Sequence, residues 1–310
     1  MITVAGFNTA IDRRIDIDTL QPGLVQRALS AHVVPGGKGL HVAQTATALG
    51  EPARLVGLSD EAHAHLLRKH LHARGVDWRG IRSPHDLRQC LAIHEADGRI
   101  TEILESGAEL HMSVREALLA ELASLIDGSH ALVLSGSLPR GFDAETYARL
   151  IRQAAACNVP CLLDASGEAL RHGVDAKPWL VKPNVDEAAA LWGSPVQSVD
   201  DAAACARWLH ARGVARAVVT LGADGAVGFD GRHAWHACLV VANVRNSVGS
   251  GDCFMAGLAV SAVRGRGLDE ALRWATACGA ANAQDEETGH VRKDRVDDLY
   301  AKVQVRQLGN

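Results

Sequence analysis

The tetrad Gly249-Ser250-Gly251-Asp252 combines residue types that could bind an anion and move a proton. It leads into an apolar stretch from Phe254 to Ala262, so we expect a loop that opens into a helix. The first N–H groups of a helix and the positive end of its dipole attract anions. In the same turn, the Asp252 carboxylate could take a proton from a hydroxyl, or it could simply cap the helix of an ordinary glycine turn.

Two segments in the N-terminal half also place polar groups beside glycines. Pro35-Gly36-Gly37-Lys38-Gly39 precedes a helix predicted over 41–49, and its glycines would let the backbone approach a ligand closely. Lys38 adds a cation that suits a phosphate or a polyol, although the segment is not the GxxxxGK[ST] phosphate loop and could be an ordinary turn. Ser135-Gly136-Ser137-Leu138-Pro139 follows a buried strand, where open α/β sheets bind ligands.

Two segments in the C-terminal half follow predicted strands in the same way. Lys182-Pro183-Asn184, with Glu187 beyond, offers a cation, an amide and a carboxylate, and Asn184 could instead be a helix cap. Residues 220–225 end another strand with a glycine turn, which is either a hairpin turn or one edge of a nucleotide site.

Short runs rich in Val, Ile and Leu alternate with helical patterns along most of the chain. Buried strands separated by helices indicate a parallel sheet with helices on both faces. The pattern predicts strands over 2–6, 54–57, 131–135, 161–164, 180–182 and 217–221.

Two regions depart from this alternation. Residues 13–34 carry strand patterns without an intervening helix, and residues 88–105 have the pattern of a hairpin with a turn at 96–99. We expect them to form a small antiparallel β lid on a single domain that spans residues 1–310. Because open sheet edges seek partners, two lids could pair in a homodimer.

Composition excludes several classes of protein. The 310 residues are 47% hydrophobic and have a formal net charge of −4, so no basic surface for nucleic acid or an anionic membrane is expected. No stretch approaches the roughly 18 apolar residues of a membrane span, and the N-terminus lacks the charged start of a signal peptide. Seven unpatterned cysteines suggest reduced thiols and a cytoplasmic enzyme. The histidine run from His63 to His72 is interpreted as the exposed face of a helix.

The order of the five polar segments resembles that of the PfkB (ribokinase-like) carbohydrate kinase superfamily, over essentially the whole chain. Other segments are similar to its branch of 1-phosphofructokinases and tagatose-6-phosphate kinases; they are residues 88–93, 101–107, 282–284 and 288–289. The resemblance implies a ribokinase-like α/β fold and ATP-dependent phosphorylation of a ketohexose phosphate. Its first candidate substrate is tagatose 6-phosphate, which would become the 1,6-bisphosphate.

The resemblance also implies roles for residues around the acceptor. Asp252 would deprotonate the sugar hydroxyl, and the N–H groups of Gly249, Ser250 and Gly251 would form an anion hole for the transferred phosphoryl group. Cationic side chains would clamp the phosphate already on the sugar; they are Lys38, Arg88 and Arg27. The full set expected to bind the sugar is Asp12, Gly37, Lys38, Gly39, His41, Arg88, Ser137 and Arg27.

A second implied set would bind ATP and Mg²⁺. Asn282 would lie near the nucleoside, and Glu187 would reach Mg²⁺ indirectly, through water. The full set is Lys182, Asn184, Glu187, Thr220, Gly222, Gly225 and Asn282. Some members of the superfamily also need K⁺. The expected partners are therefore a sugar phosphate and ATP, with no nucleic acid and no membrane.

Departures from the family pattern concern the choice of sugar. His41 stands where asparagine is usual, and its bulk and titration could alter substrate choice. Cys253 follows Asp252 where serine or threonine is common, as either a buried core thiol or an oxidation-sensitive one. A 1-phosphofructokinase, a 6-phosphofructokinase, a kinase of an unphosphorylated sugar and a non-catalytic sugar-phosphate-binding regulator remain alternatives. A nicotinamide dehydrogenase is disfavoured, because no GxGxxG follows the first strand.

Overall fold

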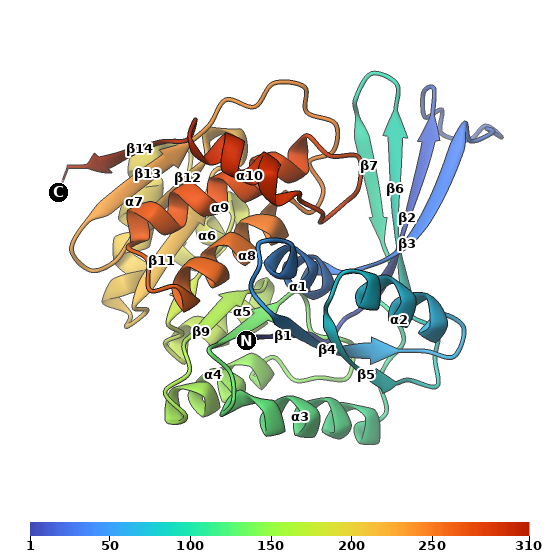
Figure 1. The fold of residues 1–310 in the computed structure, drawn as a ribbon, viewed down its shortest axis with the longest axis horizontal. Coiled ribbons are helices and arrows are strands. Elements are labelled where there is room, and N and C mark those ends of the chain that lie inside the picture. The colour runs from blue at the N-terminus through green and yellow to red at the C-terminus, as the bar shows by residue number, and fades with distance from the viewer. Residues whose placement is uncertain (310) are drawn as a thin grey trace.

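A ten-stranded sheet crosses the molecule in a computed structural model that describes residues 1–309 (Figure 1). From one edge to the other its strands are β14 (Gln304–Leu308), β13 (Ala234–Cys238), β12 (Ala226–Phe229), β11 (Arg216–Thr220), β10 (Leu180–Val181), β9 (Cys161–Asp164), β8 (Ala131–Ser135), β1 (Ile2–Gly6), β4 (Ala53–Ser59) and β5 (Asp77–Arg82). Neighbours from β11 to β5 run parallel, whereas β12, β13 and β14 add antiparallel pairs at one edge.

The parallel strands form where the apolar runs predict them. Every residue of β1, β8 and β9 is buried, as expected for strands covered on both faces. The predicted strands are confirmed within a few residues at each end. β10 ends one residue earlier than predicted, at Val181, and Pro183 follows, which has no N–H for a sheet ladder.

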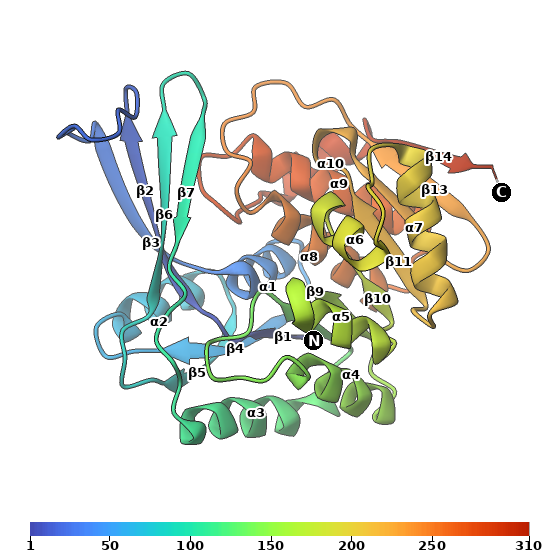
Figure 2. The ribbon, with the colours of Figure 1, turned by 180° about the vertical axis from the view of Figure 1, so that it is seen from behind.

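Helices cover both faces of the sheet, as Figures 1 and 2 show from opposite sides. One face carries α1 (Lys38–Ala48), α2 (Ala64–Ala73), α8 (Ser250–Val263), α9 (Leu268–Ala283) and α10 (Lys293–Tyr300). The other carries α3 (Met112–Ile126), α4 (Thr146–Ala156), α5 (Gly167–Asp175), α6 (Val185–Trp192) and α7 (Val199–Ala211). The predicted parallel sheet with two helical layers is therefore confirmed.

A smaller sheet projects from this body (Figure 1). Its strands, in order, are β3 (Ser30–Gly36), β2 (Ala10–Ile17), β6 (Arg88–Glu95) and β7 (Ile100–Leu104). They come from the two regions that break the helical pattern, and the predicted hairpin turn at 96–99 is confirmed. The sheet is not antiparallel throughout, because β2 and β6 run parallel at its centre. It connects to the body through the start of β2, the end of β3, the start of β6 and the end of β7.

The start of α1 lies directly against β1. A Cβ atom on Gly39 would stand 2.3 Å from the Cα atom of Gly6, closer than two such atoms approach in proteins. Only glycine at both positions allows this contact, because any side chain would push the helix away from the strand. The contact fixes Lys38 and His41, which lie on the first turn of α1, relative to the large sheet.

The histidine run lies on and just before α2. His65 and His72 are exposed as predicted, but His63 and His70 are half-buried. His63 Nδ1 lies 2.7 Å from Asp60 Oδ2, and His70 Nε2 lies 3.1 Å from Gln44 Oε1. Within residues 1–309, no cluster of three or more His, Cys, Asp or Glu side chains could hold a metal ion. No helix in the same range is long and apolar enough to cross a membrane.

Candidate active site

A cleft with a volume of about 960 Å³ lies between the smaller sheet and the carboxyl ends of the parallel strands. Residues at or just beyond five strand ends line it; they are Gly6, Ser135, Asp164, Lys182 and Thr220. Strand order reverses between β1 and β8, because the chain adds β4 and β5 on one side and β9 to β11 on the other. Ligands of open α/β sheets bind at such a switch point.

The tetrad at 249–252 forms the predicted loop and helix start at this cleft. Gly249 has a φ of 81°, which favours glycine, and α8 begins at the next residue without a side-chain cap. A Cβ atom on Gly249 would stand 2.7 Å from the Gly289 nitrogen, so the backbone passes close at this point. Gly249, Gly251 and Asp252 line the cleft, but Ser250 does not, and its N–H donates to the Ser247 oxygen at 3.2 Å. The Asp252 carboxylate contacts His41 and does not cap the helix, which removes the simplest alternative for the tetrad.

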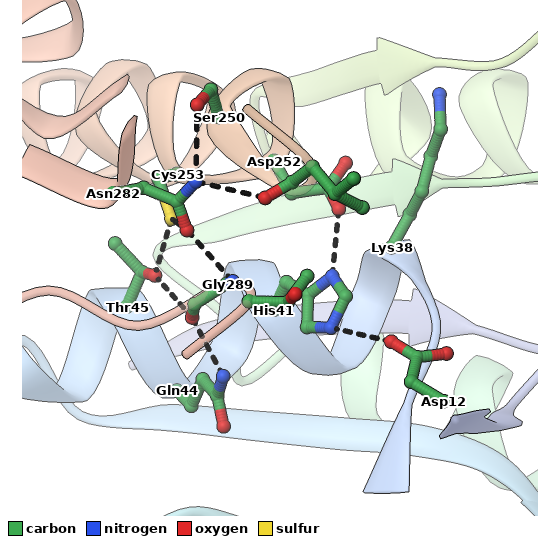
Figure 3. A network of polar contacts seen from close by, with 12 residues as sticks. Asp12, Lys38, His41, Gln44, Thr45, Ser250, Asp252, Cys253, Asn282 and Gly289 are labelled. Atoms are coloured by element: carbon green, nitrogen blue, oxygen red, sulfur yellow. Dashed lines mark hydrogen bonds and ion pairs between the residues drawn. The ribbon is translucent and has the colours of Figure 1, made fainter. Parts of the chain in front are cut away.

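His41 lies between two carboxylates (Figure 3). Its Nδ1 is 2.8 Å from Asp252 Oδ2, and its Nε2 is 3.2 Å from Asp12 Oδ2. The second contact is at ion-pair distance, but Nε2 has no well-aligned hydrogen-bond partner. Burial alone would lower the pKa of His41, yet its contacts with Asp12 and Asp252 raise that pKa to about 10. His41 is therefore a buried cation at neutral pH.

Lys38 points away from Asp12 (Figure 3). Its Nζ lies 3.4 Å from Asp164 Oδ1, and Lys182 Nζ lies 3.2 Å from Asp164 Oδ2. Asp164 raises the pKa of Lys38. Burial alone would raise the pKa of Asp164, but Lys182 and Lys38 hold it below its ordinary value. Two ammonium groups thus share one carboxylate, which leaves a net positive charge in this part of the cleft.

Asn282 holds the loop that leads into α8 by hydrogen bonds. It is fully buried, and its Nδ2 donates to the Val248 oxygen at 2.8 Å and to Ser250 Oγ at 3.0 Å. Its Oδ1 accepts from the Gly289 N–H at 2.7 Å. Asn282 does not line the cleft, in contrast to the expected position near a nucleoside. Its hydrogen bonds instead fix the loop that carries Gly249.

The segment after β10 forms a helix cap that is also part of the cleft. Asn184 Oδ1 accepts from the Glu187 N–H, and Glu187 Oε2 accepts from the Asn184 N–H, each at 2.9 Å. The helix cap expected at Asn184 is therefore confirmed, and this capped helix start lines the cleft together with Lys182, Glu187 and Thr220.

The glycine turn at 222–225 is a hairpin turn between β11 and β12. Residues Gly222–Asp224 form one 3₁₀ turn, and a Cβ atom on Gly225 would stand 2.0 Å from the Ala237 oxygen. Gly222 and Gly225 do not line the main cleft. Their turn borders a second cavity of about 460 Å³, lined in part by Leu221, Ala223 and Asp224.

Seven of the eight expected sugar-binding residues line the cleft; they are Asp12, Gly37, Lys38, Gly39, His41, Arg88 and Ser137. Arg88 donates to the backbone oxygens of Asn8 at 3.3 Å and Glu105 at 3.4 Å. Ser137 Oγ accepts from Asn8 Nδ2 at 2.9 Å. Arg27 is exposed in the loop between β2 and β3 and does not line the cleft.

Some cleft residues were missed by the sequence analysis. Asp164 ends an apolar strand at the carboxyl edge of the sheet, and that position could have marked it. Asn8 follows the first strand, where a polar side chain is a similar signal. Glu286, Glu287 and Thr288 also line the cleft, but their place depends on how the segment after α9 packs against α1, which no local pattern indicates.

Comparisons with known proteins agree over most of the chain. A protein-family model described as pfkB family carbohydrate kinase matches residues 5–295. A tagatose-6-phosphate kinase from Staphylococcus epidermidis is 28% identical over 312 residues, which cover 99% of this chain and 100% of that protein. Structures of phosphofructokinase-2 from Escherichia coli in complex with fructose-6-phosphate and in complex with potassium are each 26% identical. Each covers 97% of this chain and 98% of the other, with TM-scores of 0.86 and 0.88. A ribokinase from Arabidopsis thaliana shares the fold, with 22% identity, coverage of 96% and 98%, and a TM-score of 0.79.

Proposed function

Because this chain belongs to the PfkB family of carbohydrate kinases and is an ATP-dependent sugar kinase, we propose that its acceptor is a ketohexose phosphate. Tagatose 6-phosphate is the first candidate, with the 1,6-bisphosphate as product. Fructose 6-phosphate and fructose 1-phosphate are the alternatives within the same chemistry. The relative from Staphylococcus epidermidis supports the first choice, and the Escherichia coli complex supports fructose 6-phosphate.

One observation supports a phosphorylated sugar over a neutral one. Among residues 1–309, no carboxylate lies within ion-pair distance of Arg88, whereas the neighbouring Arg14 pairs with Asp16 at 2.7 Å. A guanidinium that lines a cleft without an anionic partner suits a phosphate, which it can bind with two parallel hydrogen bonds. We therefore assign the phosphate already on the sugar to Arg88.

The orientation of Lys38 changes its proposed role. Its ammonium group lies beside Asp164 and within the electrostatic reach of Asp252 and Glu187. This position lies between the proposed base and the proposed nucleotide residues, so we place Lys38 on the phosphoryl group in transfer. Arg27 lies outside the cleft of its own chain, so it is left out of this assignment.

Asp252 is the proposed base. The sugar O–H bond breaks as its proton passes to a carboxylate oxygen of Asp252, and the sugar oxygen forms a bond to the γ-phosphorus. The bond between that phosphorus and ADP breaks, and its electron pair leaves with ADP. The N–H groups of Gly249 and Gly251 would bind the charge on the phosphoryl oxygens, whereas the Ser250 N–H already donates to the Ser247 oxygen. Asp12 would accept hydrogen bonds from other sugar hydroxyls.

The nucleotide would occupy the side of the cleft formed by Lys182, Asn184, Glu187 and Thr220. Its phosphates would lie toward the two ammonium groups at Asp164, and its nucleoside toward the turn that contains Gly222 and Gly225. When bound, Mg²⁺ would neutralise charge on the phosphates. The donor set fits such an ion. Of the two acidic side chains on the nucleotide side, Asp164 is paired with two ammonium groups, and one oxygen of Glu187 already accepts the Asn184 N–H, so phosphates and water would supply most ligands.

We further propose that the smaller sheet is the lid of a single domain and that two lids pair in a dimer. Five of the nine large, exposed hydrophobic side chains in the described chain lie on this sheet or on its β2–β3 loop and outside the cleft; they are Leu24, Val25, Leu29, Val33 and Ile103. An exposed apolar cluster of this kind marks an interaction surface. Because both partners would present the same surface, a second copy of this chain is the partner that it fits.

The test is an ADP-release assay with tagatose 6-phosphate, fructose 6-phosphate, fructose 1-phosphate and free ketohexoses, each with K⁺ and with Na⁺. We expect the highest kcat/KM for a ketohexose phosphate. Faster turnover of a free sugar would contradict the assignment of Arg88 to a phosphate. Binding of a sugar phosphate without any turnover would instead identify a non-catalytic regulator. A rate that depends on K⁺ would add this ion to the cofactors.

A further inference from the structure

The contact of His41 with two carboxylates is unusual in a site that must bind a sugar. The side chain is buried, and Asp12 from β2 and Asp252 from α8 lie against opposite nitrogens of its ring. Buried carboxylates are costly unless a positive charge or hydrogen bonds compensate them. A doubly protonated ring supplies both, because each nitrogen then donates toward one carboxylate. An asparagine at this position would carry no charge.

Backbone on the far side holds the ring in place. A Cβ atom on Gly289 would stand 2.2 Å from His41 Cγ, so the imidazole packs against bare backbone. The Gly289 oxygen accepts from Gln44 Nε2 at 2.6 Å and from Thr45 Oγ1 at 3.2 Å, both on α1. Gly289 is thus tied to the same helix that carries His41, and the ring has no room to turn away from the carboxylates.

We propose that His41 is a positioning residue whose imidazolium joins the sugar-binding carboxylate Asp12 to the base Asp252 and holds both in place before the sugar enters. This inference rests on the proposed kinase reaction and adds to it a residue that the family pattern does not supply. His41 cannot itself take the sugar proton while both of its nitrogens are protonated. Its effect on the reaction therefore passes through Asp252.

Other charged groups around this cluster do not replace the imidazolium. The Lys38 ammonium is shared with Asp164. Burial, Arg74 and His41 lower the pKa of His70 on α2 to about 4, so His70 is neutral at pH 7. Burial, Asp12 and Asp252 raise the pKa of Glu102 on β7. Burial raises the pKa of Cys90 on β6 to about 12, which keeps the thiol neutral beside Asp12.

The proposal predicts a change in the pH profile. The pKa of His41 is raised to about 10, so its charge is present at neutral pH and is lost at alkaline pH. The kcat of the wild type should therefore fall as the pH rises through about 10, because the imidazolium then loses a proton and no longer joins the two carboxylates. His41→Asn and His41→Gln, which carry no charge, should have a lower kcat at pH 7 and should lack this alkaline loss. His65→Asn, the matched change on the exposed face of α2, should keep the profile of the wild type.

The sign of the effect on stability follows from the raised pKa of His41, about 10 when folded against about 6.5 when unfolded. The stabilisation is complete below about pH 6.5 and is lost as the pH rises through about 10. The difference in unfolding free energy between the wild type and His41→Asn should shrink over this window. Coincident pH profiles of kcat and a pH-independent stability difference would overturn the proposal and leave His41 a packing residue.

A second measurement does not depend on turnover. In ¹⁵N-histidine NMR of the wild-type protein at pH 9, one ring should still show the signals of an imidazolium, because an ordinary histidine with a pKa near 6.5 is neutral there. In the Asp12→Asn variant, that ring should lose its proton at a lower pH than it does in the wild type. If every ring is neutral at pH 9, the proposal is wrong even if the enzyme is an active kinase. If no sugar is phosphorylated but the imidazolium persists, only the proposed function fails.

Discussion

At the scale of single residues, the chemistry depends on a few side chains whose orientation is fixed by neighbours. Asp252 is in the first turn of α8, and its carboxylate is turned toward His41 and the cleft. The loop before it is held by Asn282 from α9. The proposed base and the N–H groups proposed to bind the phosphoryl group therefore share one rigid support, which would allow proton transfer and phosphoryl transfer in a single geometry.

Asp252→Asn tests the base. The amide cannot accept the proton, so we expect kcat to fall by roughly 10²–10⁴-fold while ATP binding stays close to that of the wild type. Asp298→Asn, the same change at an exposed position of α10, serves as the control. Steady-state kinetics and nucleotide titration measure the two quantities. A loss of less than about tenfold would assign proton transfer to another group.

Gly289→Ala tests the backbone behind His41. The new methyl group would meet the imidazole, and a displacement near 1 Å at a reacting group costs on the order of 10²-fold in rate. Gly265→Ala is a matched control, because Gly265 has a φ of 66° against 67° for Gly289 and nothing lies within 4 Å of its Cβ position. Both variants should lose stability from backbone strain. Only Gly289→Ala should lose kcat, and equal activity losses in the two would contradict the role of the contact.

At the scale of elements, the smaller sheet and the strand ends form opposite walls of the cleft. β2 contributes Asp12 and β6 contributes Arg88. These two strands pair with each other in the smaller sheet. Arg14 on β2 also donates to the Glu286 oxygen at 3.1 Å, so this sheet contacts the segment that lines the other wall. A movement of the smaller sheet would carry Asp12 and Arg88 together.

Arg88→Leu tests the phosphate assignment at this wall. Losing a charge-assisted contact costs about 1.5–3 kcal/mol, so KM for the ketohexose phosphate should rise about 10–100-fold. Turnover of a free ketohexose should change little. Arg68→Leu, on the exposed face of α2, is the control. An equal loss for the free and the phosphorylated sugar would show that Arg88 supports the fold of the wall and not the phosphate.

The elements were largely predictable, because buried parallel strands read as continuous apolar runs such as 131–135. The meeting of Asp12, His41 and Asp252 at one cleft was also expected, although only from the resemblance to known kinases. The direction of Lys38 was not, since it depends on Asp164 from a distant strand. The burial of Asn282 likewise depends on how the end of α9 packs beneath the loop that contains Val248.

At the scale of the whole molecule, the apolar surface of the smaller sheet is the largest departure from an ordinary polar exterior. The exposed fractions reach 99% at Val25 and 74% at Leu29, on the loop between β2 and β3. Side chains this exposed gain nothing from the fold of their own chain. Their burial against a second copy would be favourable, because each apolar Å² removed from water contributes about 25 cal/mol.

Val25→Asp tests this association. A charge at the centre of an apolar interface should shift the protein toward the monomer, measured by sedimentation equilibrium over a range of concentrations. Val240→Asp is the matched control, because Val240 is 97% exposed but lies outside the smaller sheet. If both variants sediment as the wild type does, the apolar surface is not a dimer interface.

The contact between Gly6 and Gly39 has a consequence for anyone who redesigns the enzyme. The backbones of α1 and β1 touch there without any side chain between them. A larger residue at either position would therefore break this contact and would not give a controlled shift of α1. The side chains of Lys38 and His41 can be replaced by others, but the backbone positions that carry them cannot be shifted. A library aimed at a new sugar should therefore vary the strands β2, β3, β6 and β7, which leave the floor of the cleft unchanged.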